Sequence, residues 1–455
     1  MKILGLLLET RPKTATSFSE KKIKTQRLLK VIFRFTILTS IAFILSMRPA
    51  SAATVQFSLA HNATSNIFQS YQPISDQLTA ANLSFGGDSS SVSLYGNLDL
   101  TYLYKYSGLS SIGGKVGADY LATAGARSAF YFALEGEAVY FKALYDYFNH
   151  ATIRFLANFK SYLTPSTILR LDSTSQYRNY KYSIFDYFSE NLTLSVDNYF
   201  STRTTIKAEA SYGYKLYFHP GVISSSEGSG TLTEASGIFL TTGMSGSQLL
   251  TPSVSMSSQA GPGGNHGNPG HNYEMGGSYS LRGIPYQTVY YEGSQNIQVL
   301  SISGLIAQGL GDHIGVSLSA LKQWYLGGEN PFASSDELFL VENPTYDQFS
   351  WRGYSLRAKL TAEISDRLHS EVQYDYFSRE FPGITSLDLE GNSLGLTRKD
   401  RRHQIGLRIQ LDLSRISFFA NGAYLKNISN DPWFTWDGKV ISAGLVWNLS
   451  VSSSK

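Results

Sequence analysis

The chain has 455 residues, with 40 Gly, 30 Tyr and 26 Phe, but only 16% charged residues and no Cys. Aromatic residues favour strands and Gly favours turns, so this composition suits a large all-β protein. The absence of Cys excludes disulfides and Cys-ligated metal sites. No stretch after Ala53 stays apolar for the roughly eighteen residues that a transmembrane helix needs, which excludes helical membrane spans.

The N-terminal segment has the pattern of a secretory signal peptide. A basic region ends at Arg34, an apolar run ends at Met47, and small residues at 50–52 supply a cleavage site. We therefore expect residues 1–52 to be removed as a signal peptide.

Removal of this segment changes the charge of the chain. The segment carries ten of the 38 basic residues and two of the 35 acidic residues, so the mature chain has a net charge of −5. Since no basic excess remains, nucleic acid is not an expected partner.

The rest of the chain repeats strand-length segments in which apolar and polar residues alternate. A period of two places the two kinds of residue on opposite faces of a sheet. Sixteen strands are predicted, with fourteen as the alternative count. The predicted strands are 54–61, 77–85, 91–105, 114–123, 128–142, 151–163, 167–180, 190–200, 203–217, 295–309, 312–326, 351–365, 368–379, 401–413, 415–427 and 435–451.

Short and long connections alternate between these predicted strands. The long connections are 62–76, 106–113, 143–150, 181–189, 218–294, 327–350, 380–400 and 428–434. A transmembrane, antiparallel, up-and-down β-barrel has this arrangement, with short periplasmic turns and long extracellular loops. We therefore expect residues 53–455 to form a single outer-membrane barrel.

Charged residues share one parity on several strands, opposite an apolar face. In 203–217, Lys207 and Glu209 alternate with Ile206 and Ala208. An Arg or Lys that faces lipid at the membrane midplane costs about 2–4 kcal/mol, so the charged face is expected to line a wet lumen. The pore-lining candidates are Arg154, Lys160, Arg170, Asp172, Arg178, Lys207, Glu209, Arg357, Lys359, Glu363, Glu371, Arg402 and Arg408.

The predicted inner face is nearly balanced in charge, with twelve basic and eleven acidic residues by parity. This balance predicts no strong selectivity for anions or cations. Acids concentrate on the third to fifth strands and bases on the sixth and seventh. We interpret these groups as opposed walls that orient polar solutes.

Aromatic residues of the opposite, lipid-facing parity gather near the long-loop ends of the strands. Amphipathic rings prefer the headgroup level of a membrane, so the pattern predicts an aromatic belt, with ordinary packing of aromatic strands as the alternative. The belt residues are Tyr102, Tyr104, Tyr212, Tyr214, Trp324, Tyr374 and Tyr376.

The sequence of 54–451 resembles bacterial outer-membrane β-barrel proteins. The segments 151–217, which contains YLTPSTILRLDSTSQYRNY, and 388–451, which contains DPWFTWDGKVISAGLVWNLS, are similar to parts of uncharacterised porin-like barrels. This resemblance implies a bacterial outer-membrane location, the lipid bilayer and the outer-membrane insertion machinery as partners, and no established substrate. Such chains usually end on an aromatic residue that the machinery reads; here the last aromatic residue is Trp447.

One connection, 218–294, is far longer than the others and rich in Gly and Ser. Its composition buries too little apolar surface to fold alone. Two interpretations remain open: a disordered surface loop, or a loop that folds inward and constricts the lumen.

Sequence patterns of catalysis are missing. Neither G-x-S-x-G, H-E-x-x-H nor a phosphate-binding P-loop occurs, so no catalytic, cofactor or metal site is predicted and the chain is not expected to be an enzyme. The sequence favours a passive or weakly selective channel for small polar solutes. The alternative is a non-conducting barrel that serves as a surface anchor or binding platform through its long loops. The sequence does not decide the oligomeric state.

Overall fold

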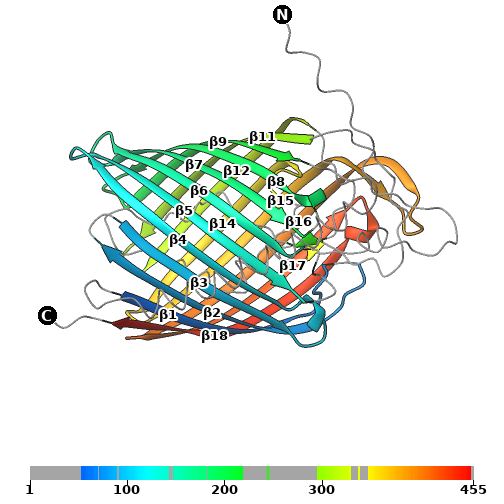
Figure 1. Cartoon of the computed structure of the whole chain (residues 1–455), viewed down its shortest axis with the longest axis horizontal. Coiled ribbons are helices and arrows are strands. Elements are labelled where there is room, and N and C mark those ends of the chain that lie inside the picture. Colours follow the sequence, from blue (N-terminus) through cyan, green and yellow to red (C-terminus); the bar gives the residue numbers. More distant parts are fainter. Residues whose placement is uncertain are drawn as a thin grey trace, which may run out of the picture.

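Sixteen strands close into an antiparallel barrel in which each strand pairs with the barrel strands before and after it in the chain (Figure 1). The first and last strands complete the ring, with Phe57 opposite Trp447 and Leu59 opposite Leu445. The predicted fold class and the count of sixteen strands are therefore confirmed. Closure leaves the described strands of the barrel wall without an unpaired edge, which is the condition for β-structure inside a lipid bilayer.

The computed structural model describes residues 53–69, 71–89, 92–142, 146, 148–181, 183–218, 243–244, 295–328, 337–338 and 347–451. The predicted signal peptide and nearly all of the 218–294 insertion lie outside these residues. Within the described ranges, no helix combines the length and the apolar character that a membrane crossing requires.

The barrel strands keep the chain order around the ring. They are β1 (Ala53–Thr64), β2 (Asp76–Ser89), β3 (Val92–Leu103), β4 (Ser111–Ala124), β5 (Ser128–Phe141), β6 (His150–Tyr162), β7 (Thr167–Tyr180), β8 (Tyr187–Tyr199), β9 (Thr204–Tyr217), β11 (Gln295–Leu310), β12 (Ile314–Gly328), β14 (Arg352–Ser365), β15 (Leu368–Leu387), β16 (Ser393–Leu413), β17 (Ile416–Ser429) and β18 (Trp436–Val451). Short pieces outside the barrel are the paired β10 (Gly243–Met244) and β13 (Glu337–Leu338), and the 3-10 turns η1 (Ser107–Leu109), η3 (Ser183–Phe185) and η5 (Pro432–Phe434).

One predicted loop, 380–400, is wrong, because most of it is strand. β15 and β16 continue past the other strands as a hairpin that extends beyond the barrel, orange at the right of Figure 1. The pairing register shifts between Glu380 and Thr385, and Gly383 and Gly395 adopt positive φ values of 82° and 65°. These irregularities interrupt the period of two that the sequence prediction relied on.

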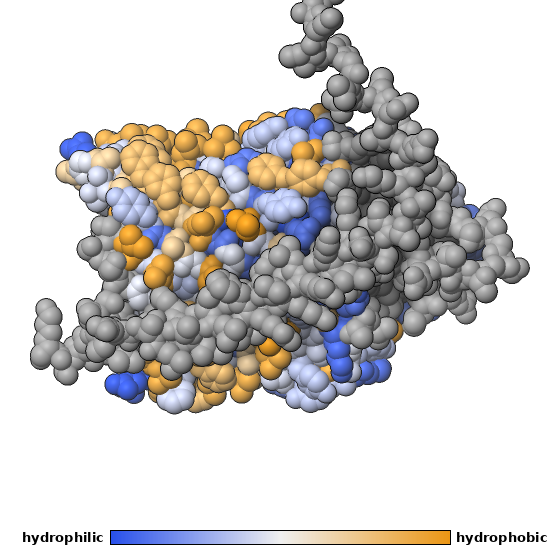
Figure 2. Space-filling view, in the orientation of Figure 1, coloured by the Kyte–Doolittle hydropathy of each residue, from blue (hydrophilic) through white to orange (hydrophobic). Residues whose placement is uncertain are grey.

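The outer face of the barrel is apolar at the positions that the alternation predicts. Ile153, Ile364 and Ile441 are 60%, 63% and 67% exposed, and each neighbours inward polar positions on its own strand. Figure 2 shows apolar side chains over much of the visible wall, with hydrophilic ones gathered toward the loop end. A closed barrel with such a band places the protein in a bacterial outer membrane.

The two ends of the barrel differ in their connections. β1 begins and β18 ends at the end with tight turns, such as the one at Gly311, whose φ of 75° suits glycine. This is the periplasmic end, and the longer connections mark the extracellular end. Because the strands follow the chain order around the ring and run antiparallel to their neighbours, every second connection lies at the extracellular end.

The lumen wall and its two mouths as the candidate functional site

The wall formed by β3–β7 carries a network of charged side chains centred on one carboxylate. Glu135 forms ion pairs with Lys115, at 3.3 Å, and with Arg154, at 3.1 Å. Tyr95 donates its hydroxyl hydrogen to the same carboxylate at 2.9 Å, and the Arg154 Nε donates to Gln176 at 3.0 Å. The network shares one negative charge between two cations, so this part of the wall is polar and carries a net positive charge.

The predicted opposition of acidic and basic walls is wrong. The acids of β3–β5 and the bases of β6 and β7 belong to neighbouring strands, and ion pairs join them directly. Besides the Arg154 pair, the Arg178 guanidinium lies 3.9 Å from Glu137 and donates to Thr152 at 2.8 Å. Because consecutive strands are neighbours in an up-and-down barrel, an acidic run of strands lies beside the basic run that follows it in the chain, and the two form ion pairs.

Further predicted wall residues form pairs with near neighbours. Arg170 lies 2.7 Å from Asp197 on β8, and Lys207 lies 2.7 Å from Glu209 on its own strand. On the other side of the barrel, Arg357 and Asp375 stand directly opposite each other on β14 and β15.

The pair of Lys359 and Glu371, at 3.2 Å, links the same two strands diagonally, one step toward the periplasmic end. Cross-strand pairs of opposite charge stabilise a sheet by roughly 0.2–1 kcal/mol each. The structure therefore brings most of the predicted pore-lining residues together in pairs.

Four predicted residues occupy other surroundings. Asp172 accepts a hydrogen bond from the Asn158 amide, and the Lys160 ammonium lies 4.9 Å from the ring centre of Tyr162. Glu363 lies at the periplasmic end of β14 and is exposed. Arg402 is buried near the extracellular end, with its guanidinium 5.1 Å from the ring centre of Trp436.

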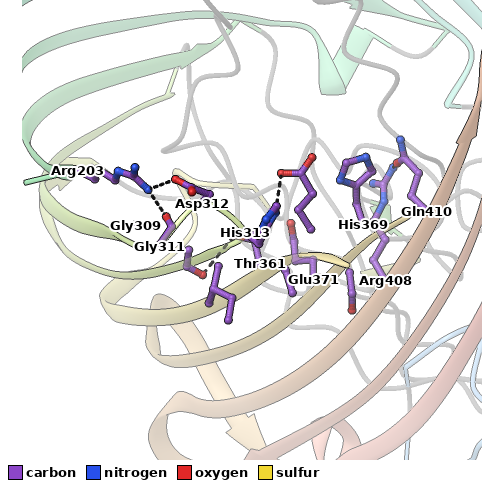
Figure 3. A pocket seen from close by; sticks show the side chains of 15 residues that line it. Arg203, Gly309, Gly311, Asp312, His313, Thr361, His369, Glu371, Arg408 and Gln410 are labelled. Carbon is purple, nitrogen blue, oxygen red and sulfur yellow. Dashed lines mark hydrogen bonds and ion pairs between the residues drawn. The ribbon is translucent and has the colours of Figure 1, made fainter. Parts of the chain in front are cut away.

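A cavity of about 680 Å³ opens at the periplasmic end of the lumen (Figure 3). Arg408 lines it and donates to Gln410 at 2.7 Å, and no ion pair of Arg408 occurs among the described residues. On its rim, Arg203 pairs with Asp312 at 2.6 Å. The periplasmic vestibule is therefore polar and carries an arginine that can attract anions.

Several vestibule residues are not among the pore-lining candidates predicted from the sequence, including His369, whose Nε2 lies 3.2 Å from Asp412. His313 and Asp312 belong to the turn between β11 and β12, where alternation does not apply. The parity of His369 on β15 could have identified it as inward-facing.

The extracellular mouth is lined by a buried cluster of apolar side chains, which we name the mouth cluster. Loop residues such as Phe68, Leu109 and Phe349 pack there against inward-facing residues at the extracellular ends of the strands. The cluster comprises Ile67, Phe68, Leu78, Ala80, Leu103, Leu109, Phe141, Phe148, Tyr180, Phe185, Tyr187, Tyr217, Ile297, Val299 and Phe349. Extracellular connections thus fold inward and narrow the entrance.

A fully buried lysine lies within the mouth cluster. Lys215 on β9 has no exposed surface, and its ammonium lies 2.5 Å from Asp347. It also lies 4.1 Å and 4.8 Å from the ring centres of Tyr187 and Tyr217. Ion pairing and cation–π contacts together offset the desolvation of the ammonium, so Lys215 ties the 347–350 segment to the barrel wall.

At the side of the mouth formed by the β15–β16 hairpin, arginine side chains stack on aromatic rings. The Arg398 guanidinium lies 3.3 Å from the ring centre of Phe434 and 2.6 Å from Asp400. The Arg379 guanidinium lies 4.7 Å from the ring centre of Phe377. Planar guanidinium groups can stack and pair at once, which suits them to this partly apolar setting.

The predicted belt residues lie on the outer face near the extracellular end. Tyr102 and Tyr104 are exposed and contact each other edge to face, with ring centres 5.3 Å apart. The hydroxyl of Tyr374 and the Nδ1 of His403 lie 2.8 Å apart. This placement is what an aromatic belt requires, and the belt itself stays a prediction.

Asp186, in the connection between β7 and β8, should make stability depend on pH. Burial raises its pKa to about 7, against the hydrogen bonds from the Tyr180 backbone N–H and the Asn179 amide. A raised pKa stabilises the fold fully below the ordinary value near 4, and this contribution is lost as pH rises through 7. The loss amounts to at most about 4 kcal/mol.

We expect the urea midpoint of the protein folded in lipid vesicles to fall between pH 5 and pH 8, and Asp186→Asn to flatten that fall. Asp388→Asn is the control, because hydrogen bonds from Asn392 lower the pKa of Asp388, which then titrates below this interval. A wild-type slope in the Asp186→Asn variant would contradict the assignment.

No protein-family model matches the chain, and no curated protein matches it. Among solved structures, the chain is similar to Pseudomonas aeruginosa OprD, at 9% identity over 88% of this chain and 95% of that chain, with a TM-score of 0.41. Acinetobacter baumannii OccAB1 is 8% identical over 89% and 100% of the two chains, with a TM-score of 0.42. Pseudomonas aeruginosa OccK8 (OprE) is 10% identical over 88% and 98%, with a TM-score of 0.41.

Proposed function

We propose that the protein is a weakly selective channel for small polar solutes across the outer membrane. The observation that carries this proposal is the paired charged lining inside a closed barrel of sixteen strands. Barrels of about this size leave an aqueous interior unless it is filled. A lining of near-neutral pairs favours hydrated polar molecules without a strong preference for either sign of charge.

The candidate pore residues take different roles in this proposal. The paired side chains around Arg154 and Arg357 form a polar wall that replaces part of a solute's hydration shell. Arg408, in the vestibule, adds a local positive potential at the periplasmic exit. The mouth cluster limits the size of solutes that enter.

Planar-bilayer recordings of the refolded protein test the proposal. The wild type should form water-filled pores, and Arg408→Ala should lower the permeability of chloride relative to potassium by roughly two- to fivefold, since one charge at about 4 Å is worth about 1 kcal/mol in water. Lys322→Gln, on the outer face, is the matched control and should keep the wild-type ratio. Absence of any conductance from correctly folded barrels would refute the channel.

The mouth cluster favours a second candidate function, a non-conducting barrel that anchors or displays its long loops. A mouth filled by Phe68, Phe148 and Phe349 has a packed apolar interior and could hold the loops in one arrangement. Ion conductance through the folded barrel distinguishes the two candidate functions. A channel conducts when its mouth is loosened, whereas a pure anchor stays closed to ions.

A further inference from the structure

Charged residues are distributed unevenly over the outer face of the barrel. In the described strands β1–β11, the outward-facing positions hold one charged residue, Glu190. In β12–β18, the outward-facing positions near the extracellular end hold Lys322, Arg352, Glu380, Lys399, Arg401, Lys426, Asp437 and Lys439. One side of the barrel therefore presents an excess of cations toward lipid.

These cations stand at the level of aromatic side chains. Arg401 lies two residues from His403 on β16, toward the extracellular end, and Lys426 lies two residues from Tyr424 on β17 in the same sense. The Lys322 ammonium lies 6.0 Å from the ring centre of Trp324 and 5.9 Å from that of Tyr354. Aromatic rings on a lipid-facing surface prefer the boundary between hydrocarbon and headgroups, so the cations are at headgroup level.

Two of the cations, Arg352 and Lys399, share one carboxylate within the protein. Glu380 lies 2.6 Å from Arg352 and 3.7 Å from Lys399. The others form no ion pair among the described residues, although Asp437 is the register partner of Lys426. We name the basic face the four remaining side chains: Lys322, Arg401, Lys426 and Lys439.

We propose that the basic face binds the phosphate-bearing headgroup of an outer-leaflet lipid. Its side chains project from the lipid-facing wall, so the molecules that meet them are membrane lipids rather than solutes in the lumen. Their long stems can lie along apolar surface while the charged ends reach the headgroups. Cations there attract anionic headgroups, and the guanidinium of Arg401 can bind a phosphate through two parallel hydrogen bonds.

The arrangement is suited to one headgroup with more than one phosphate. Arg401, Lys426 and Lys439 lie on the three consecutive strands β16–β18, each shifted by two register positions from the one before. Neighbouring strands are about 4.8 Å apart, so the three charged ends form a short row. The proposal uses the outer-membrane location and the outer face, and it does not depend on whether the lumen conducts.

Bisphosphorylated lipid A, added to the full-length protein in a neutral detergent, is the probe, and native mass spectrometry counts the bound lipid. The wild type should retain lipid A. The fourfold variant Lys322→Gln, Arg401→Gln, Lys426→Gln and Lys439→Gln should lose at least about tenfold in affinity, a part of the roughly thousandfold that four fully effective surface cations would supply. Heat-dependent gel mobility should show that the variant still forms the barrel.

Lys105→Gln with Lys142→Gln is the matched control, because both lysines are exposed at the extracellular end of the other side. This double variant should bind lipid A as the wild type does. Binding of lipid A by the fourfold variant with the wild-type affinity would overturn the proposal. So would displacement of lipid A from the wild type by inorganic phosphate, or retention of phosphatidylcholine by the wild type as strongly as lipid A. A change in oligomeric state in the fourfold variant without loss of lipid would instead assign the face to a second copy of the chain and overturn it as well.

Discussion

Replacing Lys215 with methionine should open the extracellular mouth. Methionine keeps most of the volume of the lysine stem but removes the ammonium that lies 2.5 Å from the largely buried Asp347. Removing one partner of a buried ion pair costs about 3–5 kcal/mol, and solvent at Asp347 reduces this to about 2–3 kcal/mol. Such a loss shifts the balance between a closed and an open mouth by roughly 100-fold. Single-channel recordings should show a longer open time and a larger conductance.

Lys207→Met is the control for this result. Lys207 also faces the lumen from β9, but it pairs with Glu209 on the same strand and lies nearer the periplasmic end. It should leave the open time and the conductance as they are in the wild type. If both variants conduct as the wild type does, Lys215 is not the residue that holds the 347–350 segment in place.

The faces of the barrel strands could be predicted from the sequence because a strand has a side-chain period of two. Leu407 and Arg408 are adjacent in the chain, and the structure places Leu407 on the exposed outer face and Arg408 in the vestibule. The two faces of a strand can be assigned from its own residues, without knowing which strands it pairs with. Where a bulge interrupts it, as after Glu380, the prediction failed.

The mouth could not be predicted in the same way, because its contacts join residues with no local relationship. Lys215 and Asp347 are 132 residues apart, and the segment that carries Asp347 has no strand pattern. Inward-facing aromatics such as Tyr187 and Tyr217 gave a partial signal, since large rings on a lumen-facing side suggest packing rather than a water-filled wall. To predict the uneven charge of the outer face, the order of the strands around the barrel would have been needed as well as the parity of each strand.

The lipid-facing assignment leads to the second large expected effect, an impaired membrane folding of Leu407→Arg. Leu407 is 46% exposed on the outer face and stands opposite Val372 and Gly422, well inside the apolar band. A guanidinium at this depth costs about 2–4 kcal/mol in the folded barrel, because lipid cannot hydrate it. The variant should fold into lipid vesicles with a reduced yield and a lower urea midpoint, measured by gel mobility without heating.

Arg408→Ala provides the comparison one residue further along β16. Its side chain faces the vestibule, where water can replace the hydrogen bond to Gln410, so its loss should change the urea midpoint little. The opposite faces of one strand thus predict different results for adjacent positions: an added charge at 407 impairs folding, whereas a removed charge at 408 alters ion permeation. Equal folding defects in the two variants would mean that the lipid-facing and lumen-facing sides of β16 are reversed.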